Sequence, residues 1–177
     1  MMKRITLILL LIISSITAQA QLKITSSSIK FKIKNFGVSV SGSFSGFSTS
    51  LSFTPSDLAN SSITASVKVN TIKTGIDARD KHLKSDDYFD AEKYPTITLT
   101  STKFTQLGNN KYTGFFKLTI KNKTKEISFP FTYVPSTEGG GTFTGTFTVN
   151  RLDFGVGSSS ISMSDNATVN IEVKIGK

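Results

Sequence analysis

The sequence predicts an all-β chain, either a barrel or a sandwich, on three observations. Apolar and polar residues alternate along most of the chain, turn residues separate the alternating stretches at fairly even spacing, and no long segment shows a helical period. Side chains along a strand point alternately to the two faces of a sheet, so this pattern places one apolar face toward a common interior. Many short strands of this kind are typical of antiparallel barrels and sandwiches.

The strands are expected in order from residue 29 onward. Residues 29–34 place three apolar residues on one face and three lysines on the other. In 36–44, Gly42 falls at the same alternate positions as the apolar residues, and a glycine there suits a curved sheet. Leu51 and Phe53 lead into a Thr-Pro-Ser-Asp turn at 54–57. The alternation then continues in 63–69, 94–104, 111–121, 126–133, 142–149 and 167–175, with turn residues at 108–110, 122–123 and 138–141.

Two segments break the alternation. Residues 75–90 have few β-branched side chains and include a charged run at 77–84. This composition predicts a short helix or an ordered loop, with Asp77 as its N-cap. Residues 151–157, Arg-Leu-Asp-Phe-Gly-Val-Gly, predict a second turn or short helical piece.

The N-terminus is typical of a secretory signal peptide. Lys3 and Arg4 precede an apolar run at 5–16, and small residues, Ala18 and Ala20, suit signal peptidase. The run is shorter than the roughly 20 residues that a membrane-spanning helix needs. We therefore expect a signal peptide at 1–20, one folded domain at 21–177, and a periplasmic or secreted location. No cysteine is present for a disulfide or a lipid anchor.

The charge is basic but dispersed. The formal net charge is +9, and removal of Lys3 and Arg4 would leave +7. A basic surface attracts anionic partners such as lipid headgroups or a diphosphate, whereas lysines spread over many segments are also typical of an ordinary solvated surface. The dispersion favours the solvated surface, and nucleic acid is not an expected partner.

One stretch is more specific than composition. Residues 76–97, IDARDKHLKSDDYFDAEKYPTI, resemble the central signature of the YceI-like, polyisoprenoid-binding family, and the resemblance continues at 42–47, 114–121 and 150–157, covering nearly all of 22–175. It implies an antiparallel, elongated, lipocalin-like β-barrel of about eight strands with one short helix or ordered loop. Asn35 or nearby polar residues replace a histidine that many members carry, and Asn122 and Lys123 replace a glycine.

The resemblance also implies a ligand, and we hypothesise which residues bind it. The expected ligand is a long-chain isoprenoid lipid, of polyprenyl or quinone type, held in an internal apolar tunnel. Each of the fourteen phenylalanines could either line that tunnel or fill the core. The residues expected to bind the ligand, mostly at one mouth of the tunnel, are Arg79, Asp80, His82, Phe89, Arg151, Asp153 and Phe154.

Each polar member of this set has a structural alternative. Arg79 with Asp80, and Arg151 with Asp153, could be ion pairs that brace loops. Of these, Arg151 is the better candidate for an anionic headgroup, because its guanidinium can grip two oxygens. His82, the only histidine, could donate to a headgroup oxygen or hold the loop by a structural hydrogen bond.

A carrier is favoured over other functional classes. The chain lacks cysteine and any Gly-x-Ser-x-Gly motif, and its single histidine forms no recognisable metal pattern, so we expect no enzyme, no metal and no cofactor beyond the lipid. The rival class is a secreted interaction module that recognises a protein or glycan through its loops. Transient membrane contact and homodimerisation are open alternatives.

Overall fold

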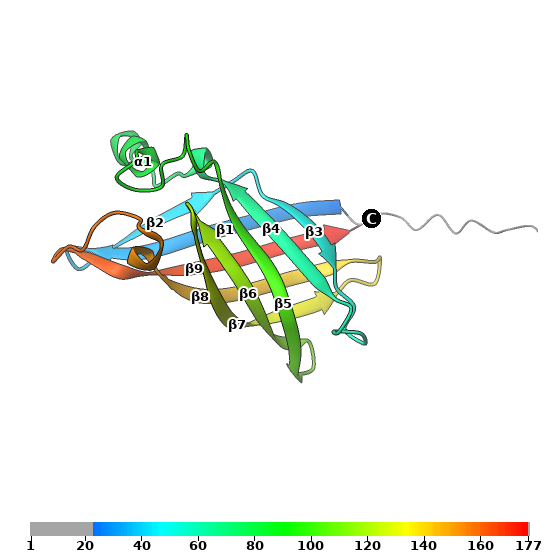
Figure 1. Ribbon diagram of the computed structural model, residues 1–177. Helices are drawn as coiled ribbons and strands as arrows, with labels where there is room; N and C mark the ends of the chain where they lie inside the picture. The colour runs from blue at the N-terminus through cyan, green and yellow to red at the C-terminus, as the bar shows by residue number, and fades with distance from the viewer. Residues whose placement is uncertain (1–22, 177) are drawn as a thin grey trace, which may run out of the picture.

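The computed structural model describes residues 23–176, which form one strongly curled antiparallel sheet (Figure 1). The order of the strands across this sheet is β2-β1-β9-β8-β7-β6-β5-β4-β3. The strands are β1 (Lys23–Asn35), β2 (Val38–Phe44), β3 (Ser48–Ser52), β4 (Ser62–Lys68), β5 (Thr96–Gly108), β6 (Lys111–Ile120), β7 (Lys123–Pro135), β8 (Gly141–Asn150) and β9 (Met163–Gly176). Three short helices interrupt them: η1 (Val69–Thr71), α1 (Asp77–Lys84) and η2 (Arg151–Phe154).

The predicted all-β, lipocalin-like class is confirmed, with nine strands in place of about eight. The sheet is a curled half-barrel whose edges, β2 and β3, share no ladder in the described part of the chain. A single bridge instead links β2 to the segment after η1, through Ser43 N–H to Lys73 O at 2.8 Å and Lys73 N–H to Ser43 O at 3.0 Å. Within 23–176, no helix has the length and apolarity to cross a bilayer. The predicted signal peptide at 1–20 lies outside the described residues.

Inward-facing glycines let aromatic rings lie against the wall of the sheet. Gly42 pairs across strands with Phe31, and Gly145 with Phe131. A Cβ atom at Gly42 would lie 2.3 Å from Cζ of Phe31, and one at Gly114 would lie 2.2 Å from Cε2 of Phe116. The rings therefore occupy the volume that side chains at these positions would need, as expected for glycines where a curved sheet must be covered closely.

The end of the half-barrel away from α1 is filled by aromatic side chains. The Phe53 ring lies at its centre and meets five other rings edge-on at centroid distances from 5.2 to 5.7 Å. We call Phe53 and these partners the aromatic plug: Phe104, Tyr112, Phe131, Tyr133 and Phe143. Edge-to-face contacts are a favoured geometry for such rings, so this end is a packed core.

The two predicted breaks in the strand pattern are α1 and η2. The N-cap prediction for Asp77 is wrong: the N-cap residue is Ile76, which makes no side-chain cap, and Asp77 is the first helical residue. Asp80, one turn later, instead accepts the N–H of Thr74, which lies outside the helix. In η2 the Asn150 side chain caps the helix by accepting the Leu152 N–H at 2.9 Å.

Gly114→Ala tests whether the glycine under the rings is required. The added methyl group collides with the Phe116 ring, which is held in the core, so we expect the free energy of unfolding to fall by about 1–3 kcal/mol. Urea denaturation of wild type and variant measures the change. Gly108→Ala is the matched control, because nothing lies within 4 Å of its Cβ position. Equal losses in the two variants would contradict this account of the interior.

Candidate functional site

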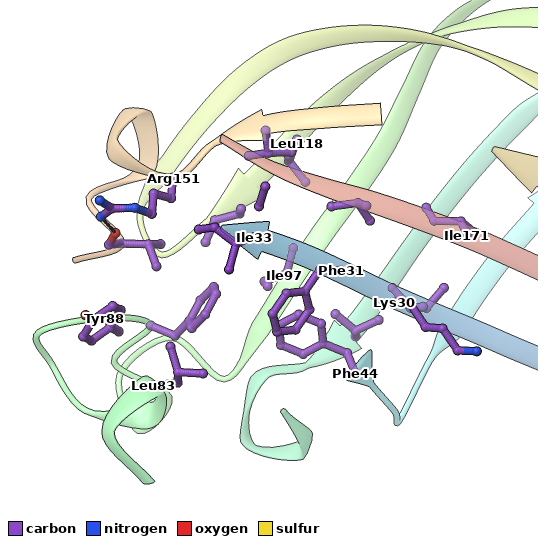
Figure 2. Close-up of a pocket in the computed structure, with 18 of the residues that line it drawn as sticks. Lys30, Phe31, Ile33, Phe44, Leu83, Tyr88, Ile97, Leu118, Arg151 and Ile171 are labelled. Carbon is purple, nitrogen blue, oxygen red and sulfur yellow. Dashed lines mark hydrogen bonds between the residues drawn. The ribbon is translucent and has the colours of Figure 1, made fainter. Parts of the chain in front are cut away.

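The half of the barrel next to α1 encloses an apolar cavity of about 210 Å³. Its wall combines inward-facing residues of β1, β2, β4, β5, β6, β8 and β9, and Figure 2 shows Phe31, Phe44 and Ile97 gathered around the space. Other members of the wall are aliphatic, among them Ile29, Ile33, Leu118, Val149, Val169 and Ile171. Such a lining suits an apolar ligand that excludes water.

A second apolar cavity, of about 80 Å³, adjoins the first. The two share Phe47, Ala65, Leu99 and Ile171 in their walls, so they are neighbours inside the half-barrel. Phe131 and Phe143 also line the second cavity, and both belong to the aromatic plug. The unfilled interior therefore runs from α1 toward the plug.

Two segments cover the α1 end, and we call them the cap: residues 74–94, with α1, and residues 150–157, with η2. Backbone and side-chain bonds join them. The Gly157 N–H donates to Asp87 O at 3.0 Å, and Lys121 Nζ donates to both Asp86 O and Gly155 O at 3.2 Å. The Tyr88 ring lies against Gly157, which has no room for a side chain there.

Arg79 and Asp80 do not form the ion pair considered from the sequence. No Arg79–Asp80 pair within 4 Å is found in residues 23–176; both side chains instead bind Thr74. Arg79 Nε donates to Thr74 Oγ1 at 2.7 Å and Arg79 Nη2 to Thr74 O at 2.8 Å. Thr74 Oγ1 in turn donates to Asp80 Oδ1. The half-buried Arg79 side chain lines the cavity, whereas Asp80 lies behind it.

Asp80 is a buried carboxyl group with uneven hydrogen bonding. Its Oδ1 accepts two bonds from Thr74, while Oδ2 has no partner in the described structure. The hydrogen bond from the Thr74 hydroxyl lowers the pKa of Asp80 below 3.8, against the opposing effect of burial. The Thr74 N–H and the positive charges of Lys73 and Lys84 lower it further. Asp80 is therefore ionised at neutral pH and holds Thr74 in place.

Arg151 is buried, and all three nitrogens of its guanidinium group donate to the protein. Nε bonds to Ser164 O at 3.0 Å, Nη1 to Val156 O at 3.0 Å, and Nη2 to Asp165 Oδ1 at 3.1 Å. The ion pair is thus with Asp165, not with Asp153 as considered from the sequence. Arg151 touches the cavity but mainly joins η2 to the loop that follows it and to the start of β9.

The remaining predicted residues are divided between the cavity, the core and the surface. Phe89 lines the cavity and meets Phe44 edge-on at 5.8 Å. Phe154 is buried in the core beneath η2, away from the cavity wall. His82 lies on the outer face of α1, with Nε2 3.8 Å from Asp87 Oδ2 and its ring against Tyr88. Asp153 is exposed and does not line the cavity.

Sequence reasoning missed the residues that join the cap together. Thr74, Lys121 and Asp165 each hold a predicted residue or segment, but none belongs to a charged motif. The signal available for Thr74 was its position three residues before the charged run at 77–84. Within 23–176, no cluster of three acidic or histidine side chains is placed to hold a metal ion.

Comparisons with known proteins agree with this architecture. A family model described as "YceI-like domain" matches residues 21–175. A UPF0312 protein of Vibrio cholerae is 33% identical over 136 residues, covering 73% of this chain and 72% of its own length. A UPF0312 protein of Vibrio parahaemolyticus is 34% identical over 143 residues, covering 76% of each chain.

Three solved structures share the fold. BcnA of Burkholderia cenocepacia has a TM-score of 0.80 at 26% identity, over 85% of this chain and 96% of its own. A YceI protein of Campylobacter jejuni has a TM-score of 0.69 at 30% identity, over 78% and 85%. A polyisoprenoid binding domain from Saccharophagus degradans has a TM-score of 0.71 over 88% and 96%; its 15% identity supports the fold alone.

Thr74→Val tests the Thr74–Asp80 bond. Removing the hydroxyl group removes the main cause of the low Asp80 pKa, so we expect this pKa to rise in a carbon NMR titration of the carboxyl group. A carboxyl group whose folded pKa is depressed stabilises the fold above its unfolded pKa, and this contribution disappears as the pH falls through the folded pKa. The variant should therefore lose stability at neutral pH and differ less from wild type as the pH falls below 3.8, the ordinary value from which the pKa of Asp80 is lowered.

Thr74→Ser is the matched control, because it keeps the hydroxyl group and should keep the low pKa of Asp80. An unchanged Asp80 pKa in Thr74→Val would show that another group sets it.

Proposed function

The chain belongs to the YceI-like family, and on that premise we propose that it is a lipid-binding carrier that shelters a long apolar chain in its half-barrel. The single observation that supports this role most directly is the apolar cavity beside a filled aromatic core. Well-packed interiors leave few voids larger than a water molecule. A space of about 210 Å³, walled by aliphatic and aromatic side chains of seven strands, is therefore suited to a ligand.

The proposed cargo is an isoprenoid lipid of the polyprenyl or quinone type. Methyl-branched apolar chains match a lining of isoleucine, leucine, valine and phenylalanine, and burial of each carbon removes apolar surface from water. The resemblance to the family implied an internal tunnel, and the larger cavity occupies the half of the interior next to α1. We propose that the plug sets the depth to which the chain enters.

The headgroup is proposed to lie under the cap near Arg79. Arg151 was the stronger candidate from the sequence, but each of its nitrogens already serves the protein. Arg79 lines the same cavity and uses Nε and Nη2 on Thr74, while its Nη1 makes no hydrogen bond within the described residues. An oxygen of a diphosphate or quinone would be an acceptor of the right kind for that nitrogen. We further propose that the carrier acts in the periplasm or outside the cell.

Native mass spectrometry of protein purified from its own envelope, followed by extraction and lipid identification, tests the proposed function. We expect one co-purifying lipid of isoprenoid or quinone size. A protein that emerges bare and also fails to take up added polyprenyl lipid would contradict the carrier and favour a module that binds partners through its loops.

Ala65→Phe provides a variant that blocks the cavity. Ala65 lines both cavities, and a cavity of about 150 Å³ is known to accept a benzene ring, so a phenyl group fits into this one. We expect lipid uptake, measured by native mass spectrometry, to fall by roughly tenfold or more while the fold persists. Ala59→Phe, on the exposed β3–β4 loop, is the matched control. Normal uptake by Ala65→Phe would place the ligand elsewhere.

Phe53→Ala tests the plug as the limit on chain depth. Loss of the central ring should lower the free energy of unfolding by about 3–5 kcal/mol and open the end of the second cavity. Among mixed polyprenyl lipids, the variant should then retain longer chains than wild type, as read from the masses of the complexes. Phe53→Leu, which keeps most of the volume, should retain the wild-type lengths. An unchanged length distribution in Phe53→Ala would show that the plug does not limit the chain.

A further inference from the structure

The turn between β1 and β2 displays an aromatic side chain to solvent. Phe36 is 81% exposed at the tip of this hairpin, and Val38 beside it is 67% exposed. Ile161, fully exposed in the loop before β9, belongs to the same surface, because the Phe36 N–H donates to Ser162 O at 2.7 Å. We call Phe36, Val38 and Ile161 the tip patch. Large apolar side chains that gather at one exposed point are typical of an interaction surface.

The backbone conformation at the tip of the hairpin indicates that the aromatic side chain of Phe36 has a role there. Asn35 pairs with Val38, so Phe36 and Gly37 form a two-residue turn with φ values of 49° and 75°. A turn with positive φ at both positions favours asparagine followed by glycine, because a side chain such as that of phenylalanine is strained in the left-handed region. Phe36 therefore adds strain to the turn while its ring contributes little burial in return.

Lysines dominate the strand that leads to the patch. From residue 23 to residue 56 the chain carries Lys23, Lys30, Lys32 and Lys34 and no acidic residue, and the last three lie on the exposed face of β1 leading to the tip. The loop 157–162 is uncharged. Exposed apolar side chains flanked by lysines suit a surface that offers both an apolar interior and negative charge, which is the composition of an anionic bilayer.

The patch also adjoins the cavity. Asn35 and Met163, which pair with each other across β1 and β9, both line the cavity, and they directly neighbour Phe36 and Ser162. The tip and the loop before β9 lie at the same end of the sheet as α1 (Figure 1). A long apolar chain is nearly insoluble in water, so a carrier must receive it from a membrane or from another protein.

We propose that the tip patch is a membrane-docking surface, which inserts Phe36, Val38 and Ile161 into an anionic bilayer and brings the cap end of the cavity to the lipid. This inference rests on the proposed function in one respect, since the bilayer is the expected source of the cargo. The contact itself depends only on the patch and the lysines.

The test is co-flotation of the purified protein with vesicles made of equal parts phosphatidylethanolamine and phosphatidylglycerol. Wild type should float with these vesicles and bind less to phosphatidylcholine alone. Phe36→Asn should weaken binding by roughly tenfold, because one large apolar anchor is lost. The same change should leave the melting temperature equal or higher, because Asn-Gly suits the turn. Ile161→Asn should also weaken binding.

Leu107→Asn is the matched control, since Leu107 is 62% exposed at the opposite end, beside the β5–β6 turn. Vesicle binding by Phe36→Asn and Ile161→Asn equal to that of wild type would overturn the proposal, as would equal binding of wild type to neutral vesicles. A wild-type dimer in sedimentation that Phe36→Asn dissociates would overturn it in favour of self-association.

A separate measurement distinguishes failure of this proposal from failure of the carrier function. Polyprenyl lipid presented in detergent micelles should enter wild type and Phe36→Asn equally, because the cavity wall is unchanged. Uptake from detergent without patch-dependent vesicle binding would overturn the docking surface alone. No uptake from detergent by either protein would contradict the carrier.

Discussion

The packing of aromatic rings onto inward-facing glycines determines what the rest of the half-barrel can be. A curled sheet has limited interior space, and a ring fits close to its wall only where the facing residue has no side chain. Gly42, Gly114 and Gly145 meet this condition. Inward residues of β6 and β7 are aromatic toward the plug and become aliphatic toward the cap, as from Tyr112 to Ile120. One end is therefore filled and the other is left hollow, and the cavity is a consequence of this gradient in side-chain size.

The polar residues near the cavity serve mainly to hold its cover. Thr74 connects Arg79 and Asp80, Lys121 joins the two segments of the cap, and Arg151 joins η2 to the start of β9. Lys121 donates to the backbone oxygens of Asp86 and Gly155, and Arg151 to those of Ser164 and Val156. Backbone oxygens that are withdrawn from water require such partners. Charged residues can thus accumulate beside an apolar site for structural reasons. Arg79 differs from Arg151 because its Nη1 makes no hydrogen bond within residues 23–176.

The strands, the positions of the helices and the apolar interior could be predicted because they follow from local patterns. Alternation along 111–121 is visible from neighbouring residues alone, and it matches β6 closely. Pairing between distant residues could not be predicted in the same way. Asp153 lies nearer than Asp165 to Arg151 in the sequence, yet the return of the chain into β9 brings Asp165 to the guanidinium group. The division of phenylalanines between plug and cavity also depends on where each strand meets its neighbours.

The seam between β2 and β3 gives the interior a property that a closed barrel lacks. The two edges share no ladder in the described residues, and the seam is spanned near its cap end by the Ser43–Lys73 bridge and the contacts of Ser45 with Thr71. A continuous ring of hydrogen-bonded strands has a fixed circumference, because widening it would break a whole ladder. Here the half-barrel can widen when only these few bonds separate. The width of its interior can therefore adjust to a slender or a bulky ligand.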